Sequence, residues 1–293
     1  MLKSVLVTGA RGQLGSSIQA LATNYPSLQF TFVDIEEIDL SCDASIEGYF
    51  QTHLFDIIIN CAAYTAVDKA ESEPDLADAV NHLAVKQLAK ISKEKEMLLI
   101  HISTDYVFNG KSFRPYIESD STDPQCVYGA SKLKGERAFQ ALNPAGMIIR
   151  TSWVYSEYGH NFVKTMLKLG SERDSLGVIF DQIGSPTYAG DLAKTILEII
   201  NVPELSRLSQ KDKVFHYSNE GVCSWYDFSN SIFEASHISC DVKPIETKDY
   251  PTPAQRPHYS LMNKSKIKQQ FDITIPYWKD SLKICIKKLQ EQK

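Results

Sequence analysis

The chain has neither an excess of positive charge nor a long hydrophobic run. Its 293 residues include 31 Lys and Arg against 36 Asp and Glu, which gives a formal net charge of -5 at pH 7. A basic stripe that binds nucleic acid is therefore not expected. No apolar stretch is long enough to span a bilayer, and the first apolar run starts at Ser4, too early to leave room for a signal peptide. These absences predict a cytoplasmic protein that binds neither nucleic acid nor membrane.

Cysteine is present, but without the spacing of a metal site or a disulfide framework. The six cysteines are scattered, and no two form a Cys-x-x-Cys pair: Cys42, Cys61, Cys126, Cys223, Cys240 and Cys285. Such a pattern fits reduced thiols of the cytosol better than disulfide bonds. The sequence also lacks internal repeats and low-complexity tracts, so we expect an ordinary globular enzyme of one large domain with a smaller dependent lobe.

What is present begins with an apolar, β-branched run followed by a glycine-rich turn. The run at residues 4–8 precedes three glycines in the spacing GxxGxxG, and a helical pattern follows. Glycines here let the backbone approach a pyrophosphate, whose charge is met by amides at the helix N-terminus. Glycine triplets also serve unrelated turns, but the strand-turn-helix context favours dinucleotide binding. We therefore expect the cofactor to be held by Gly9, Arg11, Gly12, Gln13, Leu14 and Gly15.

The second apolar run ends at Asp34, about twenty residues beyond the glycines. An acidic side chain there can accept hydrogen bonds from a ribose 2′-hydroxyl, which favours NADH. Arg11 could instead move toward a 2′-phosphate, so NADPH stays open as the cofactor. Asp39 and Leu40 lie in the next loop and could reach the adenine, although Asp39 could equally be a solvated loop residue or a helix cap.

Tyr128 and Lys132 are four residues apart on a predicted helix at residues 128–141. Positions i and i+4 share one helix face, so the ammonium of Lys132 can lie near the phenol of Tyr128 and favour its ionised form. Carbonyl reduction needs such a group, because the oxygen must be protonated as hydride reaches the carbon. This spacing also occurs by chance on many helices. The glycine motif and the polar sequence Ser103-Thr104-Asp105 after an apolar run favour the catalytic interpretation.

Short apolar runs alternate with helical patterns through the first half of the chain. Strands are expected at residues 5–7, 30–33, 57–60, 98–103 and 147–151, and helices at 15–23, 46–52, 74–93 and 128–141. The alternation predicts an α/β fold with a doubly wound, Rossmann-type parallel sheet, whose ligands bind at the carboxyl ends of the strands. The glycine loop is thus expected to share one crevice with Thr104 and with Cys61, Ala62 and Ala63. These three small residues are expected to bind the cofactor, because they would let it lie close to the backbone.

Beyond Arg150 the pattern loosens, with helices expected at residues 161–169, 190–200, 224–235 and 278–289. We expect residues 1–150 to form the NAD(P)-binding domain. Residues 151–293 are expected to form mainly a smaller C-terminal substrate-binding lobe, with some segments returning to the main sheet.

These motifs resemble those of the extended short-chain dehydrogenase/reductases, and within them the dTDP-4-dehydrorhamnose reductase family. The resemblance spans nearly the whole chain and rests on the glycine motif, on Tyr128 and Lys132, and on residues 60–71, 103–108, 150–155, 161–167, 181–187 and 250–257. The motifs of the first half are shared widely among relatives. The segments around Trp153 and at residues 250–257 are more particular to this reductase family.

The resemblance implies that NADH or NADPH is used to reduce the C4 ketone of dTDP-4-dehydro-β-L-rhamnose, giving dTDP-β-L-rhamnose. It assigns proton donation to Tyr128. It assigns to Lys132 the binding of the nicotinamide ribose and a lowering of the phenol pKa. Thr104 would form a hydrogen bond at the reacting oxygen.

Four further residues are expected to bind the dTDP-sugar. Asp105 and Tyr106 follow Thr104, and Trp153 matches a residue that contacts the sugar, although it could instead be a core aromatic. Arg256 would bind the diphosphate, because a guanidinium is a planar bidentate donor. Alternatively, Arg256 could cap a helix or pair with a nearby surface carboxylate such as Asp249.

One stretch departs from the family pattern. Some relatives bind Mg²⁺ at a dimer contact through glutamates, one of them just after the third glycine, where this chain has Ser16 and Ser17. A hard divalent cation prefers charged oxygen ligands, so the sequence argues against Mg²⁺ and leaves a homodimer open.

Two other functions stay open. One is a non-catalytic nucleotide-binding regulatory subunit, like the β subunit of methionine adenosyltransferase. The other is a sibling reductase or epimerase that acts on another nucleotide sugar. The complete set of Thr104, Tyr128 and Lys132 argues against the regulatory subunit.

Overall fold

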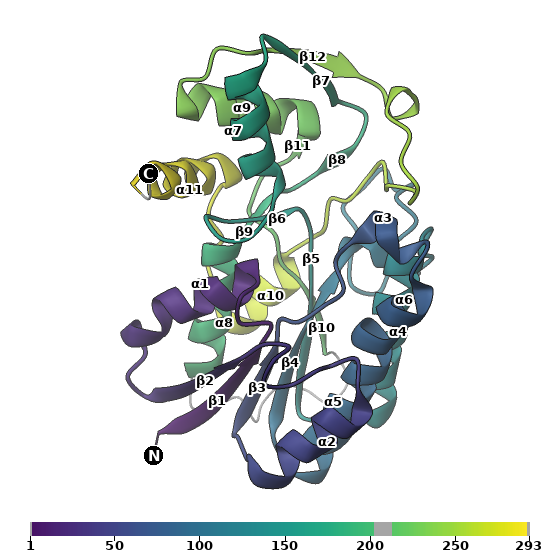
Figure 1. Ribbon diagram of the computed structural model, residues 1–293, viewed down its shortest axis with the longest axis vertical. Helices are drawn as coiled ribbons and strands as arrows, with labels where there is room; N and C mark the ends of the chain where they lie inside the picture. The colour runs from purple at the N-terminus through teal and green to yellow at the C-terminus, as the bar shows by residue number, and fades with distance from the viewer. Residues whose placement is uncertain (1, 202–212, 292–293) are drawn as a thin grey trace.

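The centre of the computed structural model, which describes residues 2–201 and 213–291, is a six-stranded parallel sheet (Figure 1). All neighbouring strands pair in parallel, in the order β2-β1-β3-β4-β5-β10. The strands are β1 (Lys3–Thr8), β2 (Leu28–Val33), β3 (Ile57–Asn60), β4 (Leu98–Thr104), β5 (Gly146–Thr151) and β10 (Val214–His216). Because the strand order reverses at β1, the carboxyl ends of β1 and β3 flank the position where such sheets bind ligands.

Helices cover both faces of this sheet (Figure 1). In β1, Val5 and Val7 pack in the hydrophobic cluster of one face and Leu6 in that of the other, which explains why the strand is apolar at successive positions. The first face carries α1 (Gln13–Leu21), α8 (Ala189–Asn201) and α10 (Ser265–Phe271). The second face carries α2 (Asp43–Thr52), α5 (Ala84–Glu94) and α6 (Val127–Leu142).

A smaller lobe lies beyond the carboxyl ends of the strands and has its own hydrophobic core (Figure 1). Phe228 and Trp278 are buried at its centre with their rings edge to face. Its helices are α7 (Phe162–Glu172), α9 (Trp225–Ser236) and α11 (Trp278–Glu291). Its strand pairs are β7 (Ser175–Ile179) with β12 (Asp241–Ile245), β8 (Ile183–Gly184) with β11 (Cys223–Ser224), and β6 (Val154–Tyr155) with β9 (Thr187–Tyr188).

Short helical segments complete the described chain. The expected helix at residues 74–93 consists of α4 (Pro74–Asp78), a π-helical turn (Ala79–Leu83) and α5 in succession. The others are α3 (Val67–Ala70) and the 3₁₀ turns η1 (Ala22–Asn24), η3 (Asp105–Val107) and η5 (Thr247–Asp249). None of the helices in the described part of the chain combines the length and the apolar character needed to cross a membrane.

The doubly wound α/β fold predicted from the sequence is confirmed. Two elements of the main layers were not predicted, the sixth strand β10 and the helix α10. Both come from the second half of the chain, as does α8, and all three join the main sheet or its covering layer. The division of the chain at residue 150 stays a prediction.

Candidate active site

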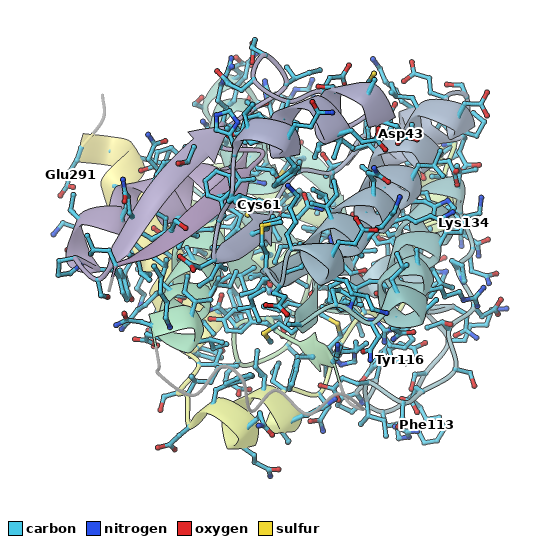
Figure 2. All side chains as sticks on the ribbon, turned by 90° about the horizontal axis from the view of Figure 1, so that it is seen from below. Asp43, Cys61, Phe113, Tyr116, Lys134 and Glu291 are labelled. Carbon is cyan, nitrogen blue, oxygen red and sulfur yellow. The ribbon has the colours of Figure 1, made fainter. Side chains whose placement is uncertain are left out.

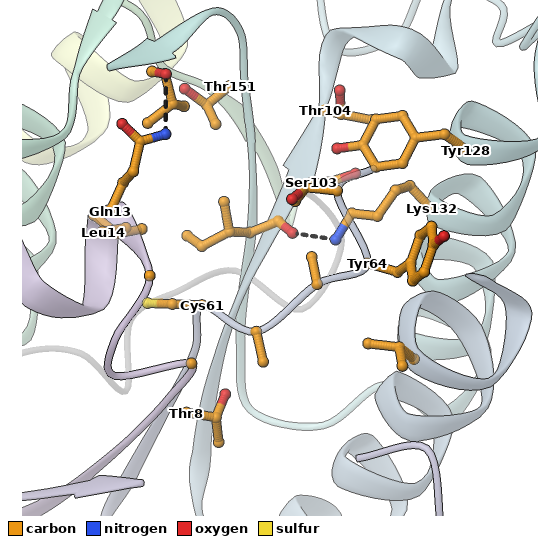
Figure 3. Close-up of a pocket in the computed structure, with 18 of the residues that line it drawn as sticks. Thr8, Gln13, Leu14, Cys61, Tyr64, Ser103, Thr104, Tyr128, Lys132 and Thr151 are labelled. Carbon is orange, nitrogen blue, oxygen red and sulfur yellow. Dashed lines mark hydrogen bonds between the residues drawn. The ribbon is translucent and has the colours of Figure 1, made fainter. Parts of the chain in front are cut away.

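A cavity of about 800 Å³ opens at the carboxyl ends of β1, β3 and β4 (Figure 3). Figure 3 shows Gln13, Leu14 and Cys61 on one side, facing Thr104, Tyr128 and Lys132 on the other. In Figure 2 Cys61 lies near the middle of the molecule, whereas Asp43 and Lys134 lie toward its periphery. The cavity brings together most residues predicted for the site: Gly9, Gly12, Gln13, Leu14, Asp34, Asp39, Leu40, Cys61, Ala62, Ala63, Thr104, Asp105, Tyr106, Tyr128, Lys132 and Trp153.

The glycine loop forms a cradle that side chains would fill. Gly9 has a positive φ of 66°, and a Cβ there would lie 2.7 Å from the backbone nitrogen of Ala62. A Cβ at Gly15 would lie 2.3 Å from the carbonyl oxygen of Gly9, so Gly15 lets α1 pack against the loop, although it does not itself line the cavity. Gly12 is the N-cap residue of α1, and because it has no side chain it does not cap the helix by a side-chain hydrogen bond. The loop and the helix N-terminus thus fit the pyrophosphate of a dinucleotide.

Three charged residues meet beside this cradle, at the end of β2. The carboxylate of Asp34 accepts hydrogen bonds from the backbone amides of Arg11 and Ile35, both at 2.9 Å. The guanidinium of Arg11 forms a bidentate ion pair with Glu36, and both side chains are exposed. Arg11 therefore lies outside the cavity lining formed by the described residues. Glu36 was not predicted, although it lies in the acidic sequence that follows β2.

Asp39 and Leu40 both line the cavity in the loop that follows. The carboxylate of Asp39 accepts hydrogen bonds from the amide and the hydroxyl of Ser41, at 2.8 and 2.7 Å. Asp39 therefore stabilises its own loop as well as facing the cavity. Whether it reaches an adenine stays a prediction.

Lys132 is almost completely buried on α6, and its ammonium donates a 2.7 Å hydrogen bond to the carbonyl of Ile102 (Figure 3). Burial lowers the pKa of Lys132 to about 8, and the nearby carboxylate of Glu136 acts in the opposite direction. The side chain is thus held at the end of β4 and points toward the glycine loop rather than into solvent.

Tyr128 lies one turn before Lys132 and also lines the cavity. Burial raises the pKa of Tyr128 above its ordinary value, while a hydrogen bond with Thr104 acts to lower it. The net direction is opposite to the shift that we expected from a neighbouring ammonium. The local spacing predicted which groups meet in the cavity, but desolvation has the largest effect on the pKa of the phenol. The mechanism in which Lys132 lowers the pKa of Tyr128 stays a prediction.

Asp105 and Tyr106 follow Thr104 in a 3₁₀ turn. The hydroxyl of Thr104 accepts from the amide of Tyr106 at 3.2 Å and donates to the carboxylate of Asp105 at 3.1 Å. Asp105 is buried, and burial raises its pKa to about 6. The ring of Tyr106 packs edge to face against Tyr128, with centroids 5.4 Å apart. These contacts fix the Thr104 hydroxyl beside the phenol of Tyr128.

A buried ion pair, not predicted from the sequence, holds the helix that carries Tyr128 and Lys132. Arg150 at the end of β5 donates two hydrogen bonds to the carboxylate of Glu136 on α6, at 2.9 and 2.6 Å. The hydroxyl of Ser103 on β4 donates to the same carboxylate at 2.5 Å. Three elements of the site are therefore joined by one carboxylate.

Trp153 lines the cavity in an unusual backbone conformation, with a φ of 50°. Its ring stacks on Trp225 of α9, with centroids 3.6 Å apart and an interplanar angle of 12°. A Cβ at Gly184 would lie 3.0 Å from the Trp153 ring, so the indole is also packed from that side. Trp153 is thus both a packed aromatic and a wall of the cavity. Trp225 was not predicted as its partner.

Arg256 lies outside the described lining of the cavity and pairs with a carboxylate that was not expected. Its guanidinium donates a 2.7 Å hydrogen bond to Asp68, at the start of α3. The suggested partner, Asp249, instead accepts from the backbone amide of Glu246 at 3.3 Å. The other terminal nitrogen of Arg256 is buried and has no hydrogen-bond partner among the described residues. Its role toward a diphosphate stays a prediction.

Gln13 faces the cavity, but its amide group connects the glycine loop to the smaller lobe. Its nitrogen donates to the carbonyl of Val154 at 3.2 Å (Figure 3). Its oxygen accepts from Ser156 at 3.1 Å and from Asn161 at 3.0 Å. The residue predicted to bind the cofactor thus also joins the two lobes next to Trp153.

Ser16 and Ser17, where some relatives have a magnesium ligand, form hydrogen bonds with the backbone of Ala10 and Gln13. Across the described residues, no cluster of three or more His, Cys, Asp or Glu side chains is arranged to hold a metal ion. The expectation about Mg²⁺ stays a prediction.

A doubly wound sheet with a glycine cradle at its switch point, faced by a Tyr and a Lys one helical turn apart, defines an extended short-chain dehydrogenase/reductase. The family described as RmlD substrate binding domain matches residues 3–291. A dTDP-4-dehydrorhamnose reductase of Aggregatibacter actinomycetemcomitans is 41% identical over 285 residues, which are 95% of this chain and 97% of the relative. The chain belongs to the dTDP-4-dehydrorhamnose reductase family.

Two solved structures agree with this assignment. A dTDP-4-dehydrorhamnose reductase of Clostridium acetobutylicum is 39% identical, with a TM-score of 0.91 over 98% of this chain and 99% of that chain. A dTDP-4-dehydrorhamnose reductase of Bacillus anthracis, solved in complex with NADP, is 36% identical, with a TM-score of 0.91 over 98% of this chain and 100% of that chain. The chain is therefore an oxidoreductase of a nicotinamide-dependent class.

Proposed function

We propose that the protein reduces the C4 ketone of dTDP-4-dehydro-β-L-rhamnose to the alcohol of dTDP-β-L-rhamnose. The observation that carries the proposal is one cavity in which the glycine cradle faces Thr104, Tyr128 and Lys132, in a chain of this reductase family. Residues 151–293 would mainly bind the sugar nucleotide. The six free cysteines support a location in the reducing cytoplasm.

The residues of the cavity have distinct roles in this proposal. A bound nicotinamide supplies the hydride. Tyr128 gives its phenolic proton to the C4 oxygen as that oxygen gains negative charge. Thr104 turns its hydroxyl proton from the carboxylate of Asp105 to the same oxygen and donates a hydrogen bond there. Lys132 holds the nicotinamide ribose, and its positive charge offsets the effect of burial on Tyr128.

Substrate binding is assigned to Trp153, Asp105 and Tyr106, which line the cavity, and to Arg256, which lies outside its described lining. Trp153 contacts the sugar, since its indole is fixed between Trp225 and Gly184 and faces the cavity. Asp105 and Tyr106 lie beside Thr104 and line the same space. Arg256 binds the diphosphate after exchanging the carboxylate of Asp68 for a phosphate oxygen. This exchange requires that the ion pair between Arg256 and Asp68 breaks.

Either nicotinamide cofactor is accommodated in this proposal, and NADH is used at least as well as NADPH. Asp34 at the end of β2 can accept a hydrogen bond from a ribose 2′-hydroxyl, which favours NADH. The Bacillus anthracis relative was solved in complex with NADP, so that protein binds the phosphorylated cofactor. The glycine cradle and the uncapped start of α1 suit the pyrophosphate that both cofactors share.

Oxidation of NADH or NADPH by dTDP-4-dehydro-β-L-rhamnose, followed as loss of the reduced nicotinamide absorbance, tests the function. Tyr128→Phe should lower kcat roughly a hundredfold to ten-thousandfold, because the proton donor is lost, while NADP⁺ still binds. Tyr64→Phe is the matched control, since Tyr64 lines the same cavity but its hydroxyl donates to Glu73. That variant should keep its turnover.

Three outcomes would contradict parts of the proposal. Near-normal turnover of Tyr128→Phe would remove Tyr128 from the mechanism. No turnover of the wild-type protein with any 4-keto sugar nucleotide, despite cofactor binding, would favour a regulatory subunit. Faster turnover with a different nucleotide sugar would identify a sibling reductase or epimerase.

A further inference from the structure

Asp34 and Glu36 both form hydrogen bonds with Arg11 of the glycine loop, but with different groups of it. Asp34 binds the backbone, because its carboxylate accepts from the amides of Arg11 and Ile35 and thereby holds the loop against the end of β2. Glu36 binds a side chain, because both of its carboxylate oxygens accept from the guanidinium of Arg11. Asp34 therefore shapes the loop, and Glu36 determines where the charge of Arg11 lies.

Arg11 is the cation within the glycine loop itself, and acidic groups surround it. The charges of Glu36, Asp34 and Glu37 all raise the pKa of Arg11, with Glu36 contributing most through its hydrogen bond. Glu37 differs from Glu36 in its partner, since it accepts from the backbone amide of Asp34 at 2.8 Å. One carboxylate at this turn thus pairs directly with Arg11, and the others act on it through charge.

We propose that Glu36, by pairing with Arg11, sets the preference of this enzyme between NADH and NADPH. This inference rests on the proposed function, because it concerns the cofactor of the same site. A 2′-phosphate is doubly or nearly doubly charged at neutral pH, and a guanidinium is the side chain best suited to bind it. To reach Arg11, the phosphate must displace Glu36 and then lie near its carboxylate. A ribose 2′-hydroxyl needs no such exchange.

The exposure of the pair predicts a modest preference rather than an exclusive one. The side chains of Arg11 and Glu36 are 63% and 57% exposed, so water and salt weaken their attraction. The exchange of Glu36 for a phosphate is then feasible, which agrees with a site that accepts both cofactors. Asp34 remains bound to the loop in either case.

Titration calorimetry with NAD⁺ and with NADP⁺ tests the proposal on the full-length protein without any sugar substrate. Glu36→Gln should lower the Kd for NADP⁺ about threefold to fivefold and leave the Kd for NAD⁺ unchanged. Glu37→Gln is the matched control, because it removes one negative charge from the same turn while its amide oxygen can still accept from Asp34. The control should change both Kd values less than twofold, within the range of a general charge effect.

A double substitution shows whether Arg11 carries the effect. In an Arg11→Met background, Glu36→Gln should give no selective gain for NADP⁺, because the cation that binds the phosphate is absent. Equal gains from Glu36→Gln and Glu37→Gln would overturn the proposal in favour of net charge. A gain that survives in Arg11→Met would also overturn it, as would no gain at all.

These results are separable from the proposed reaction. If both cofactors bind as expected but no sugar is reduced, the reductase function fails and the role of Glu36 stands. If turnover with the sugar is normal but Glu36→Gln leaves the ratio of the two Kd values unchanged, the role of Glu36 fails alone. Thermal unfolding of each variant confirms that the folded protein is compared throughout.

Discussion

Replacement of Lys132 by Met should make the cofactor-free protein more stable while it damages the active site. Lys132 is almost completely buried, and burial lowers its pKa from the ordinary 10.5 to about 8. The folded protein therefore binds this proton more weakly than the unfolded chain does. Below about pH 8 the ammonium is buried at the full free-energy penalty, and between pH 8 and 10.5 stability rises with pH as the proton is lost.

The size of the effect follows from the shift in pKa. One pKa unit corresponds to about 1.4 kcal/mol, so the shift of Lys132 amounts to roughly 3 kcal/mol. The substitution also removes the hydrogen bond to the carbonyl of Ile102, which offsets about 1 kcal/mol of that gain. Since the methionine chain can occupy similar space, we expect Lys132→Met to raise the free energy of unfolding at pH 7 by roughly 2 kcal/mol.

Urea unfolding at pH 7 and at pH 10 measures this prediction. The gain in stability should be present at pH 7 and largely gone at pH 10, where the wild-type amine is mostly neutral. Lys134→Met is the matched control on the same helix, because Lys134 is exposed and pairs with Asp78 at the surface. It should show no gain at either pH.

A variant of Lys132 that is less stable than the wild type at pH 7, or whose gain is equal at both pH values, would refute the argument from desolvation. The same variant should bind NAD⁺ and NADP⁺ more weakly, because the group proposed to hold the nicotinamide ribose is absent. A gain in stability together with a loss of affinity would identify Lys132 as a residue kept for function at the expense of stability.

Two further predictions concern Asp105 and Arg256. Burial raises the pKa of Asp105 to about 6, so the folded protein binds this proton more tightly than the unfolded chain does. Its contribution to stability is therefore greatest below about pH 4 and is lost as the pH rises through 6. Asp105→Asn should remove this pH dependence of the free energy of unfolding, measured with urea between about pH 4 and 8. Arg256→Ala should raise KM for the sugar nucleotide roughly tenfold and leave the Kd for NADP⁺ unchanged. An equal loss of both, or of folded protein, would show that its pair with Asp68 is structural.

The strands that could be predicted from the sequence are those buried on both faces. The four residues of β3, for example, are all buried and apolar except the last, Asn60, so the run 57–60 stands out locally. The sixth strand, β10, has only three residues, and its strand conformation depends on pairing with β5. Three residues are too few to show a periodic pattern, and the partner strand lies more than sixty positions earlier.

The same distinction between local and distant contacts explains which parts of the site could be predicted from the sequence. The spacing of the glycines and of Tyr128 and Lys132 is set within one turn or one helix, so it is visible in the sequence, whereas the close approach of Gly9 to Ala62 is not. The partners of Trp153 and Arg256 come from distant segments, and Asp68 is 188 positions from Arg256. Such pairs could not be found from composition or periodicity.

Electrostatics within the cavity was the least predictable part of the site. The i,i+4 rule predicts that Tyr128 and Lys132 share a face, and both do line the cavity. It says nothing of desolvation, which raises the pKa of the phenol and lowers that of the ammonium. A buried phenol with a raised pKa is fully protonated at neutral pH, which is the state required of a proton donor, yet it is a weaker acid. In the proposed reaction the remaining acidity must therefore come from groups that stabilise the phenolate. Thr104 is one such group, because its hydrogen bond acts to lower the pKa of Tyr128. Lys132 is proposed as the other, and it lies at the same side of the cavity (Figure 3).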